Sequence, residues 1–150
     1  MKVILQKVKK ASVSVDGKIV GEIDKGYCLL VGVHKESTEA DAKYLAKKIV
    51  EARLFEDENE KLNLGLKDVN GSILSVSQFT LYADTKKGKR PSFTNAASAE
   101  EANKLYNKFN EYLREEGIKV ETGIFQTMME VNIINDGPVT IIYEKLSLGN

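Results

Sequence analysis

The sequence has 150 residues, 42% of them hydrophobic and 29% charged, proportions typical of a single folded domain. Lys plus Arg and Asp plus Glu each number 22, so a polyanionic partner would need a local basic patch rather than a global field. The single cysteine, Cys28, excludes an internal disulfide, and no apolar run is long enough for a membrane span. We therefore expect residues 1–150 to form one domain that works in the cytoplasm.

The first third of the chain has the patterns of β-strands. Apolar residues alternate loosely over residues 3–15, which predicts strands with one buried face. Asp16-Gly17 is a hairpin signal, and residues 18–22 continue as the returning strand. The short apolar run 27–33 predicts a central strand, in which Cys28 is expected to be buried as a small hydrophobe.

Two later segments have helical periodicity. Thr38 is a candidate N-cap for a helix whose apolar residues recur at helical spacing up to Ala52. Ser98 and Glu101 form a capping-box pattern for a second helix that Gly117 ends. Strand-like runs occupy residues 72–77, 118–121, 128–134 and 139–144. The order predicts an α+β fold, with an antiparallel-rich curved sheet or barrel-like core packed by two main helices.

Several kinds of chemistry lack the residues they need. His34 is the only imidazole, so a Ser-His-Asp or Cys-His system would depend on it, and a hydrogen-bonded structural role suits its place at a strand end. One His with one Cys argues against catalytic zinc, and the acidic run 56–60 is better explained as a solvated turn. Phosphate-binding glycine loops are absent from the sequence. We expect neither a metal nor an organic cofactor.

Polar residues follow the buried run 72–76. Strand alternation would place Ser77 and Phe79 on one face and Gln78 and Thr80 on the other. Free N–H groups at the end of a central strand can stabilise an oxyanion, and losing one such donor typically costs about 3–4 kcal/mol of transition-state stabilisation. The structural alternative is that these groups only satisfy the end of a strand.

Two other segments allow a structural and a functional interpretation. Asp136-Gly137-Pro138 reads as a tight turn before a strand, or as a cis Gly-Pro unit that presents its carbonyls rigidly. The loop Lys86-Lys87-Gly88-Lys89-Arg90-Pro91 is either a solvated basic loop or a binding site for phosphates.

Together these segments resemble the D-aminoacyl-tRNA deacylase family over essentially the whole chain. The resemblance rests on motifs that occur in family order, namely residues 3–6, 11–13 and 21–23, Ser77-Gln78-Phe79-Thr80-Leu81, Ala83-Asp84, Arg90-Pro91-Ser92-Phe93 and Asn135-Asp136-Gly137-Pro138-Val139-Thr140. It implies a hydrolase that cleaves the ester between a D-amino acid, or glycine, and the terminal ribose of tRNA. It implies tRNA as the partner, with neither DNA nor a membrane.

The resemblance also implies how handedness is sensed. Gly137 and Pro138 would form a cis peptide that reaches into the active site of a second subunit, so the enzyme would be a two-fold homodimer. There the main-chain carbonyls would exclude the side chain of an L-amino acid, whatever that side chain is.

Site residues follow from the same resemblance. Ser77, Gln78, Phe79 and Thr80 would line the pocket, Phe125 and Met129 would border the terminal adenosine, and Arg90 is a further substrate-binding candidate. Because no base is evident beside Thr80, we favour attack by water assisted by the ribose 2′-hydroxyl over a covalent Thr80 nucleophile.

One departure and two rival functions remain. Gln126-Thr127-Met128 stands where the family usually has small residues, so the rim of the pocket and its preference for glycine or bulky D-residues are expected to differ.

A non-catalytic tRNA-binding module that uses the 86–90 loop is the main rival to the deacylase function. A general small-ester hydrolase with Thr80 as nucleophile is the other.

Overall fold

The sheet is built around one long strand, β1 (Lys2–Val15), in a computed structural model that describes residues 1–147. Two strands pair antiparallel with different parts of β1, β2 (Lys18–Ile23) with residues 11–15 and β3 (Gly26–Gly32) with residues 2–8. β8 (Glu130–Glu144) runs antiparallel along the other edge of β1. Antiparallel pairing therefore dominates, as the sequence predicts.

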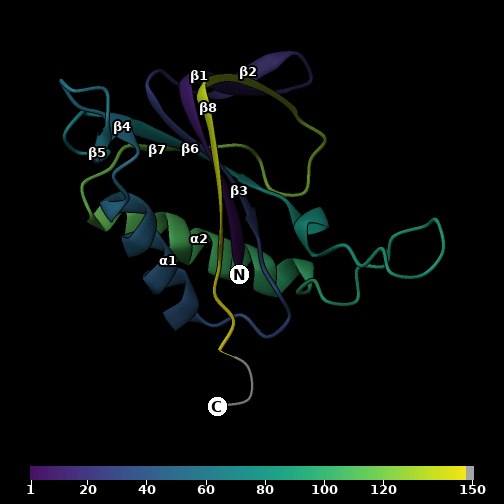
Figure 1. Ribbon diagram of the computed structural model, residues 1–150. Helices are drawn as coiled ribbons and strands as arrows, with labels where there is room; N and C mark the ends of the chain where they lie inside the picture. The colour runs from purple at the N-terminus through teal and green to yellow at the C-terminus, as the bar shows by residue number, and fades with distance from the viewer. Residues whose placement is uncertain (148–150) are drawn as a thin grey trace.

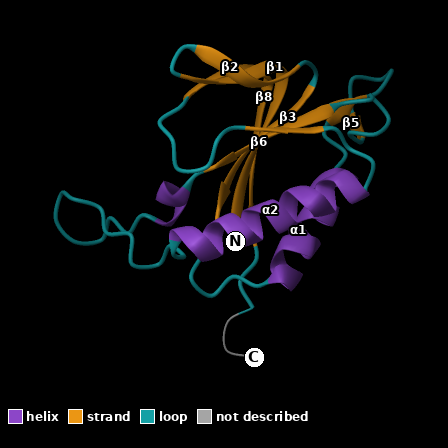
Figure 2. Cartoon of the chain, turned by 180° about the vertical axis from the view of Figure 1, so that it is seen from behind, coloured by secondary structure: helices purple, strands orange, loops and turns teal. Residues whose placement is uncertain are grey.

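The remaining strands extend the sheet in parallel and make it curl. β6 (Ser72–Ser77) pairs parallel with β3, and β7 (Val120–Thr122) pairs parallel with β6. Gly21 in β2 lies so near β7 that a Cβ atom there would be 2.6 Å from the carbonyl oxygen of Thr122. Because the two ends of the sheet approach each other, it is nearly closed into a barrel (Figure 2).

Two helices cover the lower part of this sheet, α1 (Glu39–Glu51) and α2 (Ala99–Glu115) (Figure 1). Thr38 caps α1 with a reciprocal pair of hydrogen bonds to Asp41, of 3.2 Å and 3.0 Å. The Ser98 hydroxyl accepts a bond from the Glu101 N–H at 3.3 Å. The caps predicted from the sequence therefore begin both helices. Neither helix, within the described residues, is long and apolar enough to cross a bilayer.

Buried side chains form two clusters because the central strands bury both faces. Tyr27 and Leu29 of β3 pack toward the helices, against residues such as Phe109. Cys28 and Leu74 point the other way, into the curl of the sheet. The α+β class with a barrel-like core and two main helices is confirmed.

The structure differs from the predicted elements in three places. The two runs 128–134 and 139–144 belong to one continuous strand, β8, because pairing with β1 persists on both sides of the intervening Asn135–Val139 segment. A short hairpin of β4 (Phe55–Glu56) and β5 (Leu62–Leu64) surrounds the acidic turn and was not predicted. Strand structure also stops at Ser77, where a 3-10 helix, η1 (Phe79–Tyr82), begins after Gln78.

Candidate active site

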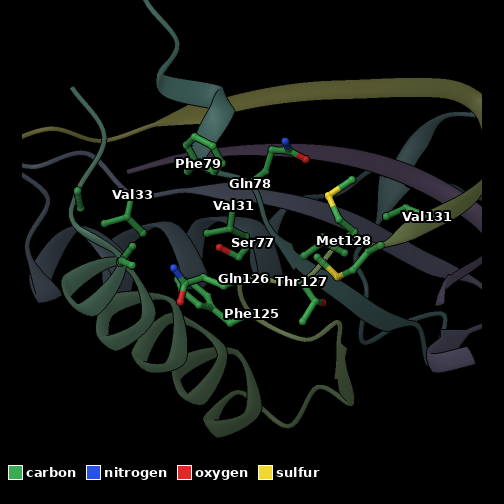
Figure 3. A pocket seen from close by; sticks show the side chains of 15 residues that line it. Val31, Val33, Ser77, Gln78, Phe79, Phe125, Gln126, Thr127, Met128 and Val131 are labelled. Atoms are coloured by element: carbon green, nitrogen blue, oxygen red, sulfur yellow. The ribbon is translucent and has the colours of Figure 1, made fainter. Parts of the chain in front are cut away.

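A pocket of about 600 Å³ opens where β6 ends, facing the start of α2 (Figure 3). One wall consists of the end of β6 and the first residue of η1, and the other consists of α2 and the segment 125–131. The carboxyl ends of β3 and β6, which are parallel neighbours, meet at this edge of the sheet. The pocket thus lies beside the motif that the sequence singles out.

Ser77, Gln78 and Phe79 all line this pocket. The Gln78 N–H donates to the Val31 carbonyl at 2.8 Å, which continues the β3–β6 ladder one residue beyond the strand. The chain then turns into η1, so strand alternation ends after Gln78. Ser77 and Phe79, which strand alternation places on one face, both lie at the site, and Gln78 between them contributes to the same lining.

Thr80 is placed differently. It is exposed and is absent from the pocket lining, and its hydroxyl accepts a hydrogen bond from the Gln78 amide. The first bond of η1 runs from the Leu81 N–H to the Gln78 carbonyl at 3.3 Å. Within residues 1–147, the N–H groups of Phe79 and Thr80 consequently donate to no acceptor. Two free main-chain donors therefore follow Ser77, one on Phe79, which lines the pocket, and one on the adjacent Thr80.

The opposite wall is mostly apolar. Phe125 and Met129 both line the pocket, as do the three residues between them, Gln126, Thr127 and Met128. A Cβ atom on Gly123 would lie 2.5 Å from the Met129 sulfur, so the glycine makes room for this side chain. The exposed Met128 side chain stands at the rim, 92% accessible.

Arg90 lies outside the pocket. It is exposed in the loop between η1 and α2, whose base is fastened by mutual backbone hydrogen bonds of 2.7 Å and 2.9 Å between Asp84 and Ser92. The neighbouring basic side chains of this loop are exposed as well, namely Lys86, Lys87 and Lys89.

Gly137 and Pro138 also lie outside the pocket of their own chain. They are exposed on β8, and the peptide between them is cis. In the register of β8 with β1, Thr140 faces Gln6 and Asn135 faces Val8, so the four residues 136–139 have a single counterpart on β1. The Gly-Pro unit therefore stands out as a bulge on the strand.

The groups with ordinary catalytic chemistry are elsewhere. His34 Nδ1 accepts a bond from the Glu36 N–H at 2.9 Å, its ring packs edge-on against Tyr82, and burial lowers its pKa. Its predicted structural role is supported by these contacts. Cys28 is fully buried, and desolvation raises the pKa of its thiol to about 12. No group of three or more potential metal ligands occurs among residues 1–147.

Sequence reasoning did not identify several pocket residues, which include Val31, Val33, Ala97, Ala99 and Ala102. The two valines follow from the parallel pairing of β3 with β6, which brings the ends of both strands to one edge. The alanines lie before and within the first turn of α2, where small side chains leave the cavity open. Only the capping signal at Ser98 indicated where that helix begins.

The chemistry that this geometry allows is acyl transfer to water. Mostly apolar walls surround the cavity, and one lining residue, Phe79, has a free main-chain N–H group, which suits the binding of an ester carbonyl. The pocket lining contains no imidazole, thiol, amine or carboxylate that would act as nucleophile or general base. Among the described residues, the lining does include the hydroxyls of Ser77 and Thr127. The fold and the pocket together suit an ester hydrolase.

Comparison with known proteins is consistent with this class. The model of the family described as D-Tyr-tRNA(Tyr) deacylase matches residues 4–144. A relative from Staphylococcus haemolyticus is 62% identical over 144 residues, 96% of this chain and 95% of the relative. A relative from Bacillus cytotoxicus is 56% identical over 96% of this chain and 99% of the relative. Both are named D-aminoacyl-tRNA deacylase.

Two solved structures have a similar fold. One titled c-Myc DNA Unwinding Element Binding Protein has a TM-score of 0.91 and 39% identity, covering 98% of this chain and 100% of that one. Another, of a probable eukaryotic D-amino acid tRNA deacylase, has a TM-score of 0.82 at 16% identity, with 95% and 97% covered, and shows the same fold. The chain belongs to the D-Tyr-tRNA(Tyr) deacylase family. The family and the enzyme class predicted from the sequence, an ester hydrolase, are confirmed.

Proposed function

We propose that this protein hydrolyses the ester that joins a D-amino acid to the terminal ribose of tRNA, and that it also clears glycine from mischarged tRNA. The observation that carries the proposal is the pocket beside Ser77, Gln78 and Phe79, edged by free N–H groups, in a chain 62% identical to a D-aminoacyl-tRNA deacylase. Removal of such esters is proofreading for translation, and the proposed compartment is the cytoplasm.

The reaction needs no protein nucleophile. A water molecule attacks the ester carbonyl, the bond from the carbonyl carbon to the ribose oxygen breaks, and that oxygen takes up a proton. The ribose 2′-hydroxyl next to the ester assists the transfer of the proton. The N–H groups of Phe79 and Thr80 hold the oxyanion, and each such donor is typically worth about 3 kcal/mol in the transition state.

Rejection of L-amino acids is assigned to Gly137 and Pro138 of a second copy. Both residues are exposed on the β8 bulge and do not line their own pocket, which is the placement expected of a group that acts across a two-fold axis. A main-chain wall clashes with any L side chain regardless of its chemistry. Glycine, which has no side chain, passes the same wall.

The rival with an observation in its favour is a non-catalytic tRNA-binding module. The loop with Lys86, Lys87, Lys89 and Arg90 is exposed and basic, as such a module requires. That function predicts salt-sensitive binding of tRNA and leaves the ester intact.

One assay separates these functions. The protein is incubated with D-Tyr-tRNA, L-Tyr-tRNA and Gly-tRNA, and release of each labelled amino acid is followed. We expect rapid release of D-tyrosine and glycine, with L-tyrosine retained on its tRNA. Equal release of both tyrosine isomers would remove the stereochemical claim, and tight binding of all three substrates without release would favour the rival.

A further inference from the structure

Two exposed aromatic rings pack against each other beside the pocket. The rings of Phe79 and Phe93 meet edge to face, with their centroids 5.0 Å apart and an angle of 61° between their planes. Phe79 is 57% exposed and Phe93 is 37% exposed, so neither ring is held by the hydrophobic core. Phe79 lines the pocket (Figure 3), whereas Phe93 does not. Any effect of Phe93 on the reaction would therefore pass through Phe79.

The segment that carries Phe93 is attached to the rest of the chain on both sides. Ser92, directly before it, exchanges main-chain hydrogen bonds of 2.7 Å and 2.9 Å with Asp84. The Asn95 carbonyl, two residues after it, accepts a bond of 2.9 Å from the Lys35 N–H, just beyond β3. Main-chain bonds that flank Phe93 thus give its ring a fixed support.

Phe79 has less support from the main chain. It is the first residue of η1, and within residues 1–147 its N–H group donates to no acceptor. η1 is only four residues long, and 3-10 turns have poorer hydrogen-bond geometry than α-helices. The contact with the ring of Phe93 holds the side chain of Phe79, and it thereby restricts the direction of the N–H group on the same residue.

We propose that Phe93 is a positioning residue, which holds Phe79 so that its N–H group points at the oxyanion of the transition state. The inference rests on the proposed function, in which this N–H group stabilises the oxyanion. Negative charge develops on the carbonyl oxygen only as water attacks, so a fixed donor favours the transition state over the bound ester. Losing the contact should therefore lower kcat and leave the binding of substrate unchanged.

The alternative is that the two rings only shield each other from water. Phe93→Leu separates the two ideas, because leucine retains an apolar side chain but lacks the ring that meets Phe79. Phe93→Tyr retains the ring and should restore the behaviour of the unaltered protein. Phe93 belongs to neither buried cluster, so both variants should fold. The matched control is Tyr44→Leu, which removes a 47% exposed aromatic ring from α1 that does not line the pocket.

The experiment measures kcat for D-Tyr-tRNA and the affinity for two analogues of the aminoacyl ester. In one analogue, an amide joins D-tyrosine to adenosine and mimics the bound substrate. In the other, the phosphonate analogue of D-tyrosine is esterified to adenosine, and its anionic tetrahedral phosphorus mimics the transition state.

In Phe93→Leu we expect kcat to fall and Kd for the phosphonate to rise by the same factor. That factor should be about twofold to tenfold, the range typical of one aromatic pair. Kd for the amide should stay as it is, because the amide carries no oxyanion. Tyr44→Leu should leave all three values unchanged.

Three results would overturn the inference. Equal weakening of both analogues in Phe93→Leu would mean that the residue shapes the pocket in general. Unchanged kcat and unchanged affinity for the phosphonate would mean that the contact has no role in the reaction. A loss in Phe93→Tyr as large as in Phe93→Leu would mean that the ring is not what matters. In each case, release of D-tyrosine by the unaltered protein leaves the proposed function standing, whereas absence of that release would remove both.

Discussion

The hydroxyl of Tyr106 in α2 donates a 2.7 Å hydrogen bond to the main-chain carbonyl of Ser75 in β6, and both groups are buried. Ser75 precedes Ser77 by two residues on the strand that ends at the pocket. The Tyr106 ring also lies 6.3 Å from the ring of Phe125, on the opposite wall. The Tyr106 side chain therefore contacts both the strand that forms one wall of the pocket and Phe125 on the other wall.

Removing only that hydroxyl, with Tyr106→Phe, should affect both stability and catalysis. The buried Ser75 carbonyl would lose this partner, which typically lowers the free energy of unfolding by about 1–3 kcal/mol. If the bond positions the end of β6, kcat for D-Tyr-tRNA should also fall several-fold while KM changes little. Urea unfolding and single-turnover deacylation measure the two effects.

The matched control is Tyr112→Phe. Tyr112 lies on the same helix, and its hydroxyl donates to Glu39 on the exposed surface of α1. This change should leave kcat as it is. If Tyr106→Phe lowers the stability but retains full kcat, the hydroxyl supports the fold and does not position the pocket.

Thr80→Val tests whether a hydroxyl of the protein attacks the ester. Because the Thr80 hydroxyl is occupied by the Gln78 amide and lies outside the pocket lining, we expect kcat to fall by no more than about tenfold, the effect of removing one hydrogen bond. Loss of a true nucleophile typically lowers kcat by about 10⁴-fold or more. Thr94→Val, at another exposed threonine, is the control.

The exposed loop between η1 and α2 should set the affinity for tRNA by neutralising phosphates. For the double change Lys87→Ala and Lys89→Ala, we expect a higher KM with unchanged kcat, since neither lysine lines the pocket. The slope of log affinity against log salt should become less steep by about 0.7–0.9 for each phosphate that the loop no longer neutralises. The control is Lys47→Ala with Lys48→Ala on α1. An unchanged slope in the loop variant would place the tRNA elsewhere.

The fold was largely predictable because its signals are local. Caps at Thr38 and Ser98, helical apolar stripes and the hairpin at Asp16-Gly17 each involve residues that are close in sequence. The path of β8 was not predictable. The sequence around Gly137-Pro138 has the pattern of a turn, and only pairing with β1 on both sides keeps the strand continuous.

The candidate site was predicted only in part, because some of its residues have a local signal in the sequence and others do not. Ser77, Gln78 and Phe79 stand out because polar residues follow a buried run, and they do line the pocket. Thr80 shares that sequence signal but is exposed and lies outside the lining, because the strand gives way to η1. The alanines of α2 and the buried Tyr106 give no such signal, since their role depends on a helix that packs against a strand far away in the sequence. Tyr106 and its hydrogen-bond partner Ser75 are 31 residues apart.

Pro138→Ala should weaken the rejection of L-amino acids. Pro138 is exposed on the β8 bulge, where the proposed wall would face a second copy of the chain. We expect release of L-tyrosine from L-Tyr-tRNA to rise while release of D-tyrosine continues, measured as the ratio of the two rates. The control is Pro91→Ala, at the other proline of the chain, which lies in the basic loop and should leave this ratio unchanged.

A mixing experiment shows whether the wall acts on its own pocket or on that of a partner. The Pro138→Ala protein is unfolded and refolded with an excess of Ala99→Trp, a variant in which a bulky ring at the start of α2 fills the pocket while Pro138 stays intact. If the wall acts across a two-fold axis, each working pocket then meets an intact Pro138, so rejection of L-tyrosine returns. If the ratio stays as in Pro138→Ala alone, Pro138 acts on the pocket of its own chain. The proposal that Pro138 of one subunit excludes L-amino acids from the pocket of the other would then be wrong.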